Sequence, residues 1–119
     1  LDEQIAVFDG LSNREQLELL ELTICHYERF QAEVGEMIAY YETGDLAGMM
    51  RMAERYDSPL HARFMDVLLR QRNHRMVERM RTRLERGGAF VAIGALHLPG
   101  PEGVLKLLQS DGFRVTRMY

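Results

Sequence analysis

The chain has 119 residues, a formal net charge of −3 and 46% apolar residues, which is enough for one small domain with one core. No apolar run approaches the ~18–20 residues that span a bilayer, so no transmembrane segment is expected. The negative charge argues against a protein that mainly coats nucleic acid. The arginines between residues 70 and 86 are interleaved with glutamates and lack alternating aromatic residues, so we expect no nucleic-acid partner.

Four helices are predicted in the first two-thirds of the chain, over residues 2–8, 13–43, 45–56 and 59–87. Ser12, followed three residues later by Glu15, has the pattern of a capping box. Asp45 is placed to cap the third helix, and Pro59 is favoured in the first turn of the fourth, which ends at Gly87. Apolar residues recur at roughly helical spacing in the second helix, at Leu17, Leu20, Ile24, Tyr27, Val34, Ile38 and Tyr41.

The pattern changes after residue 88. Residues 89–93 form a short apolar run beyond a pair of glycines, which predicts a buried parallel strand. Residues 101–110 predict a helix, and the alternation over 113–118 predicts a second strand. We therefore predict one α/β unit over residues 1–119, in which a mainly helical N-terminal two-thirds precedes a βαβ unit with parallel strands. Because two strands alone are not a stable sheet, the unit is expected to be part of a larger sheet fold.

The sequence Gly-Ala-Leu-His over residues 94–97 follows directly on the first predicted strand. Ligands of open α/β sheets collect beyond the carboxyl ends of the strands. A sharp turn at Gly94 would present His97 at that edge, and histidine serves in metal ligation and in proton transfer near neutral pH. His97 is therefore either a metal ligand or catalytic residue, or an ordinary hydrogen-bonded loop histidine. HExxH, CxxC, P-loop and GxSxG motifs are absent, so it is the one well-placed candidate.

Two polar residues interrupt the apolar side of the predicted helix over 59–87. At roughly 100° per residue, Arg72 and Asn73 fall inside the apolar arc, whereas His74 falls on the opposite, solvated face. A buried guanidinium is costly unless it is paired and hydrogen-bonded. Either Arg72 and Asn73 line a polar cavity as catalytic or binding residues, or Arg72 extends to solvent while Asn73 caps a neighbouring backbone group.

Taken in order, these segments resemble the C-terminal half of the TraB/PrgY/GumN family. The resemblance is carried by Arg72-Asn73, by Gly94-Ala95-Leu96-His97-Leu98-Pro99-Gly100 and by Asp111-Gly112-Phe113-Arg114-Val115. It implies an α/β fold with two facing GxxH motifs, and peptidase-like, metal-dependent hydrolysis as in the related Tiki metalloproteases. By the resemblance, His97 would be a metal ligand, Gly94 the glycine of the second GxxH motif, and Arg72 and Asn73 catalytic or supporting residues. It assigns no substrate-binding residue.

The first GxxH motif of the family has no counterpart here, and the chain begins at Leu1 rather than Met. The resemblance thus implies the C-terminal fragment of a metal-dependent hydrolase of the bacterial cell envelope or periplasm. The full-length protein would hold a divalent metal ion, and the fragment would be inactive alone. The alternative is a non-catalytic module that binds a peptide or a small-molecule ligand. Because an incomplete sheet leaves an edge open, we expect a homodimer or pairing with the missing N-terminal half.

Overall fold

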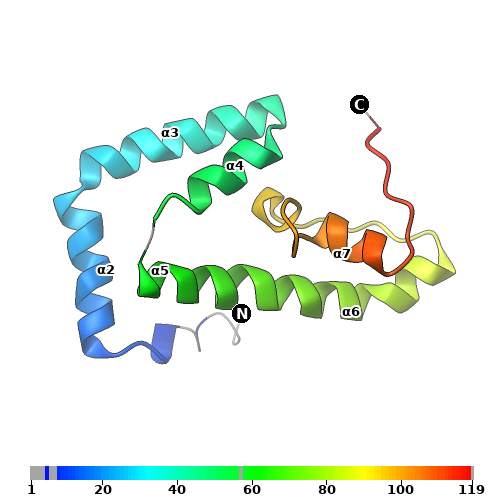
Figure 1. Ribbon diagram of the computed structural model, residues 1–119, viewed down its shortest axis with the longest axis horizontal. Coiled ribbons are helices and arrows are strands. Elements are labelled where there is room, and N and C mark those ends of the chain that lie inside the picture. Colours follow the sequence, from blue (N-terminus) through cyan, green and yellow to red (C-terminus); the bar gives the residue numbers. More distant parts are fainter. Residues whose placement is uncertain (1–4, 6–7, 57, 119) are drawn as a thin grey trace.

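A computed structural model of the protein describes residues 5, 8–56 and 58–118. Three helices come first: α2 (Asn13–Cys25), α3 (Tyr27–Thr43) and α4 (Leu46–Ala53). A long rod follows, made of α5 (Pro59–Phe64), the π-helical turn η1 (Met65–Arg70) and α6 (Gln71–Arg86). The short 3-10 turn η2 (Ala95–His97) and helix α7 (Val104–Ser110) complete the order. In Figure 1, α2 extends from the beginning of α3 towards the side of the molecule where the rod begins, α4 folds back beside α3, and α7 lies along α6.

Polar side chains cap the first helices where the sequence predicts them. The Ser12 hydroxyl accepts a hydrogen bond from the Glu15 backbone N–H at 3.3 Å, and the Glu15 carboxylate accepts one from the Ser12 backbone N–H at 2.8 Å. The Asp45 carboxylate accepts from the Gly48 N–H at 2.8 Å. The predicted helix over 13–43 is divided at His26, where φ is −119° and ψ is 30°. Neither proline nor glycine marks this break, so the apolar spacing alone does not reveal it.

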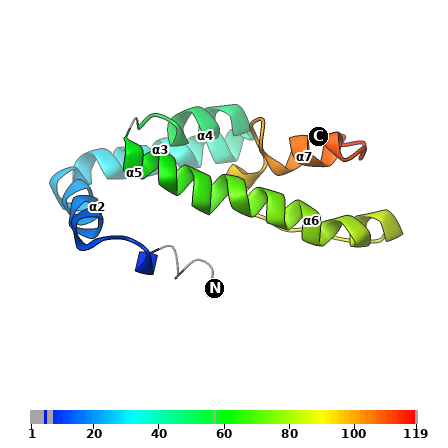
Figure 2. The same ribbon diagram turned by 60° about the horizontal axis from the view of Figure 1, so that its bottom comes forward.

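The rod contains one wide turn and ends at two glycines. The Gln71 N–H bonds to the Asp66 carbonyl oxygen, five residues earlier, as in a π-helix. Gly87 and Gly88 have φ of 76° and 71°, a region that glycine enters without the steric cost other residues meet. The chain reverses there and returns alongside α6, so that α6 and the segment after it lie side by side in both views (Figures 1 and 2).

The predicted βαβ unit is wrong, because the structure has no strand in residues 5, 8–56 or 58–118. Residues 88–94 and 113–118 have no regular secondary structure, and Phe90 is 92% exposed. A strand exists only where its backbone groups pair with a neighbouring strand, and no such neighbour lies among the described residues. The apolar run over 89–93 is therefore not a buried strand, and its residues are exposed or half-buried. The part of the chain that the structure describes is helical rather than α/β. Residues 2–4 and 6–7 of the predicted first helix lie outside it.

The core is small for a chain of this length. Its radius of gyration is 16.3 Å, whereas a compact chain of this size has about 13–14 Å. The apolar residues that identified the helices in α2 and α3 remain largely exposed, so this face is not covered by the described residues. None of the described helices has the length and hydropathy required to cross a membrane. The buried apolar residues are Leu11, Met49, Leu60, Leu69, Val77 and Val104.

Gly103 fixes the turn that leads into α7. A Cβ atom at this position would collide with the backbone carbonyl oxygens of Leu98 and Pro99, which cannot move aside cheaply. We expect Gly103→Ala to lower the free energy of unfolding by about 1–3 kcal/mol, measured by urea denaturation. Gly35 is the matched control, because it lies in α3 with no atom within 4 Å of a built Cβ. Gly35→Ala should leave stability unchanged or raise it, and equal stability of both variants would contradict this packing of the turn.

Candidate functional site

The candidate site is centred on the side chain of Asn73, in the first turn of α6. Leu69, Asn73 and Val77 follow at intervals of four residues and are all buried, so they form one line along the rod. Asn73 is only 1% exposed. The structure therefore confirms the prediction that Asn73 lies within the apolar side of this helix. Arg72, its neighbour, is half-buried.

Asn73 forms two short hydrogen bonds that reach the segment running back along α6. Its Nδ2 donates to the Glu102 backbone carbonyl oxygen at 2.7 Å, and its Oδ1 lies 2.7 Å from His97 Nδ1. An amide nitrogen only donates and a carbonyl oxygen only accepts, so the Glu102 carbonyl fixes which way the carboxamide points. Oδ1 then faces the imidazole, and His97 Nδ1 must carry the proton. The neutral His97 ring consequently has its lone pair on Nε2.

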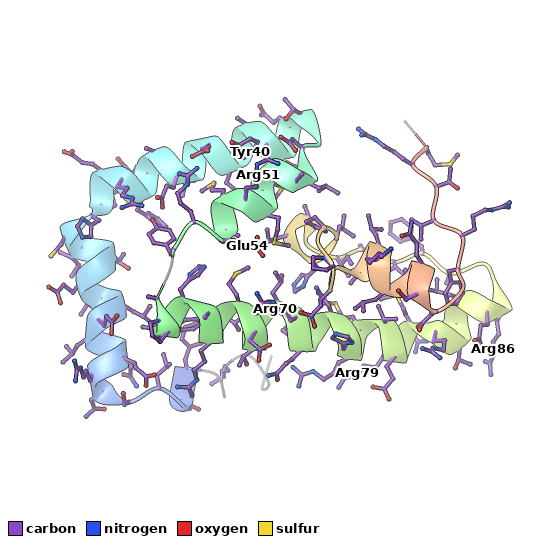
Figure 3. All side chains as sticks on the ribbon, in the orientation of Figure 1. Tyr40, Arg51, Glu54, Arg70, Arg79 and Arg86 are labelled. Atoms are coloured by element: carbon purple, nitrogen blue, oxygen red, sulfur yellow. The ribbon has the colours of Figure 1, made fainter. Side chains whose placement is uncertain are left out.

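Glu102 ties the turn over residues 98–103 to α6 through its side chain as well. Its carboxylate lies 3.2 Å from His74 Nε2 and 3.5 Å from Arg70 Nε. Arg70 lies on the side of the rod that faces Glu54 of α4, as Figure 3 shows, and both residues line a cavity of about 160 Å³ that also contacts Asn73. The His74 side chain is 55% exposed, as predicted for the solvated face. Three residues of the rod, Arg70, Asn73 and His74, thus hold this turn in place through Glu102.

Arg72 acts on the same histidine by its charge. Its Nη1 donates to the Leu68 carbonyl oxygen at 3.3 Å, one turn back along the rod. Burial lowers the pKa of the His97 imidazole below its ordinary value of 6.5, and the positive charge of Arg72 lowers that pKa further. The structure therefore brings Arg72, Asn73 and His97 to one place. His97 is neutral at pH 7 in this environment.

Gly94 does not have the backbone conformation that the sequence led us to expect. Its φ of −62° and ψ of 139° are accessible to any residue, so a sharp turn does not explain glycine here. A Cβ built at Gly94 would approach one residue within 4 Å, the Cδ2 atom of His97 at 3.6 Å. That is an ordinary van der Waals distance. The absent side chain therefore leaves open space directly beside the imidazole.

That space belongs to an apolar groove of about 540 Å³ between α3, α4, the rod and η2. Gly94 and His97 lie at one part of its wall. The groove cannot be predicted from local sequence patterns, because its walls come from segments that lie far apart in the chain. The other lining residues are Met37, Tyr41, Met49, Phe64, Met65, Leu68, Leu69, Ala95 and Leu96.

The described residues do not form a complete metal site. Within residues 5, 8–56 and 58–118, no three His, Cys, Asp or Glu side chains are grouped so that they could hold an ion. A zinc site takes about three or four protein ligands. His97 is flanked by Asn73, Arg72 and apolar groove residues, so its Nε2 atom fits one ligand position at most.

Comparison with known proteins identifies the class. The chain matches the model of the TraB/PrgY/gumN family over residues 1–117, and it belongs to that family. Among curated proteins it is similar to the metalloprotease TIKI2 of Danio rerio, with 28% identity over 142 residues. This alignment covers 97% of the chain but 27% of the relative, so the chain spans about a quarter of that protein's length. No solved structure matches the chain.

The lowered pKa of His97 predicts a pH dependence. As pH falls below 6.5, His97 of the unfolded chain takes up a proton before His97 of the folded chain does. This contribution to stability is therefore complete above pH 6.5 and is lost as pH falls through the lower folded pKa. We expect the His97 NMR titration midpoint to lie below 6.5 and to rise in Arg72→Gln. In the control Arg79→Gln, whose side chain leaves α6 on the face away from α7 (Figure 3), the midpoint should not move. Equal midpoints in the two variants would contradict the role of Arg72.

The two hydrogen bonds of Asn73 predict a large stability effect. Asn73→Leu keeps the side-chain size but leaves the Glu102 carbonyl and His97 Nδ1 without this partner. Both hydrogen bonds are part-buried, and an unsatisfied buried group costs about 1–3 kcal/mol, so the free energy of unfolding should fall by about 1–3 kcal/mol in chemical denaturation. Asn13→Leu, at an exposed position that begins α2, should change it by no more than about 0.5 kcal/mol. Equal losses of unfolding free energy in Asn73→Leu and Asn13→Leu would contradict a stabilising role for the two hydrogen bonds of Asn73.

Proposed function

We propose that this chain supplies a histidine ligand and its supporting residues to the active site of a metal-dependent hydrolase that cleaves peptide bonds. The observation that carries the proposal is the hydrogen bond between Asn73 Oδ1 and His97 Nδ1. Histidine ligands of metal ions typically donate their second ring N–H to a carbonyl or carboxylate oxygen, which fixes the tautomer and the ring orientation. Asn73 gives His97 this arrangement and leaves Nε2 available.

Membership of the TraB/PrgY/gumN family and the similarity to a protein named as a metalloprotease support the reaction class. When bound, a divalent ion in such a site supplies an activated water for attack on the peptide carbonyl. Residues beyond the described part of the chain would have to provide its other ligands. The relative is far longer than this chain, which leaves room for them.

Each candidate residue then has a separate task. His97 presents Nε2, and Asn73 holds the imidazole in the required tautomer. Arg72 would stabilise the negative charge that develops on the carbonyl oxygen, as pre-oriented cations do in hydrolytic sites. The Arg72 guanidinium donates a hydrogen bond to the Leu68 carbonyl oxygen, and its positive charge still lowers the pKa of His97. This effect on the imidazole supports the proposed role, because the charge is near enough to act at the site. The glycine of the motif, Gly94, leaves the space beside the ring free.

One substitution pair tests the proposal in the full-length protein that contains this chain. His97→Ala should lower both bound divalent metal and the rate of peptide hydrolysis, the rate by about 100-fold or more. His74→Ala removes a histidine that is neighbour to Asn73 in sequence and contacts the Glu102 carboxylate, and it should leave both quantities within about twofold. Metal content is measured by elemental analysis and hydrolysis by mass spectrometry of a peptide mixture.

Unchanged metal content and hydrolysis in His97→Ala would overturn the proposal. A wild-type protein that binds peptides at His97 without forming products would instead favour the non-catalytic binding module. The chain taken alone should show no turnover, since its described residues offer a single ligand.

A further inference from the structure

The side chains that line the groove beside His97 are almost all apolar. Met37 and Tyr41 come from α3, Met49 from α4, and Leu68 and Leu69 from the rod. Among the residues that the structure describes, the His97 ring and the Tyr41 phenol are the only ionisable side chains that line the groove. A charged or strongly polar group that entered it would lose water without gaining partners, whereas an apolar group would gain by leaving water. The wall chemistry therefore selects apolar occupants.

We propose that this groove receives a large apolar side chain of the peptide substrate, adjacent to the bond that is cleaved. The inference rests on the function proposed above, because His97 and Gly94 connect the groove to the reacting centre. The volume of about 540 Å³ falls in the range of roughly 300–1,000 Å³ typical of small-ligand sites. It can hold a leucine, methionine or phenylalanine side chain together with its backbone.

Three methionines indicate how selective the groove is. Met37, Met49 and Met65 reach it from α3, α4 and η1. Methionine side chains are unbranched and polarizable, so they repack around ligands of different shape. The groove should therefore accept large apolar side chains as a class, instead of discriminating sharply among leucine, methionine and phenylalanine.

Gly94 provides an independent observation that points to an occupant. Its backbone conformation suits any residue, and a Cβ there would make one ordinary contact, with His97. The fold therefore does not require glycine at this position. A methyl group there would instead occupy the groove beside the imidazole, where the substrate side chain is expected.

The test follows methionine methyl groups by NMR in the protein labelled with 13C at these methyls. The probes are three acetylated tripeptide amides with glycine at both ends and leucine, phenylalanine or serine in the middle. The leucine and phenylalanine peptides should shift the methyl signals of Met37, Met49 and Met65, and the serine peptide should not. Gly94→Ala should weaken binding of the leucine peptide by about fivefold or more without lowering stability. Gly35→Ala, at a position in α3 that does not line the groove and has open space around it, should leave binding within about twofold.

Three results would overturn the inference. They are equal shifts with the serine peptide, unchanged binding in Gly94→Ala, and methionine methyl groups that no peptide moves because another part of the protein fills the groove. The proposed hydrolase function fails separately, by the His97→Ala experiment. Peptide binding that obeys the pattern above, in a full-length protein that releases no product, would support the apolar groove and refute the hydrolase.

Discussion

The structure depends on one buried carboxamide. Asn73 joins α6 to the returning segment by donating to a backbone carbonyl and accepting from an imidazole. Because residues 88–94 belong to no sheet, backbone ladders do not fix how this segment lies along α6. Side-chain contacts do so instead, through Asn73 and the Glu102 carboxylate and, farther along, through the ion pair of Arg81 with Asp111. The same side chains therefore maintain both the fold and the geometry of the site, so a substitution that destabilises the fold here should also disturb the site.

His97 lies between two environments of opposite character. On one side are the Asn73 carboxamide and the charge of Arg72, which set its tautomer and favour its neutral form. On the other side is the methionine-lined groove, which offers little polar surface. A histidine held in this way keeps one ring nitrogen available next to an apolar cavity. In the proposed function, this combination would join metal ligation and substrate recognition at a single residue, and the other metal ligands would come from outside the described part of the chain.

Local sequence patterns predicted part of this arrangement. Capping residues such as Ser12 and Asp45 bond within one turn, so their roles can be identified from spacing alone. Asn73 was recognised because it interrupts an apolar face, and the family motif singled out His97. The predicted strands failed because strand formation depends on a distant partner, which a run such as 89–93 does not encode. The break at His26 and the groove also arise from tertiary packing and have no local signature.

The π-helical turn η1 restricts where residues can be inserted into the rod or deleted from it. It lies immediately before Asn73, and its wider turn sets the rotational phase of everything that follows in the rod. Each residue added to or removed from an α-helix rotates the remainder by about 100°. A single deletion between Pro59 and Arg70 would therefore carry the carboxamide away from the imidazole, even if every side chain of the site were retained. Homologous chains should conserve the number of residues in this part of the rod more strictly than their identity.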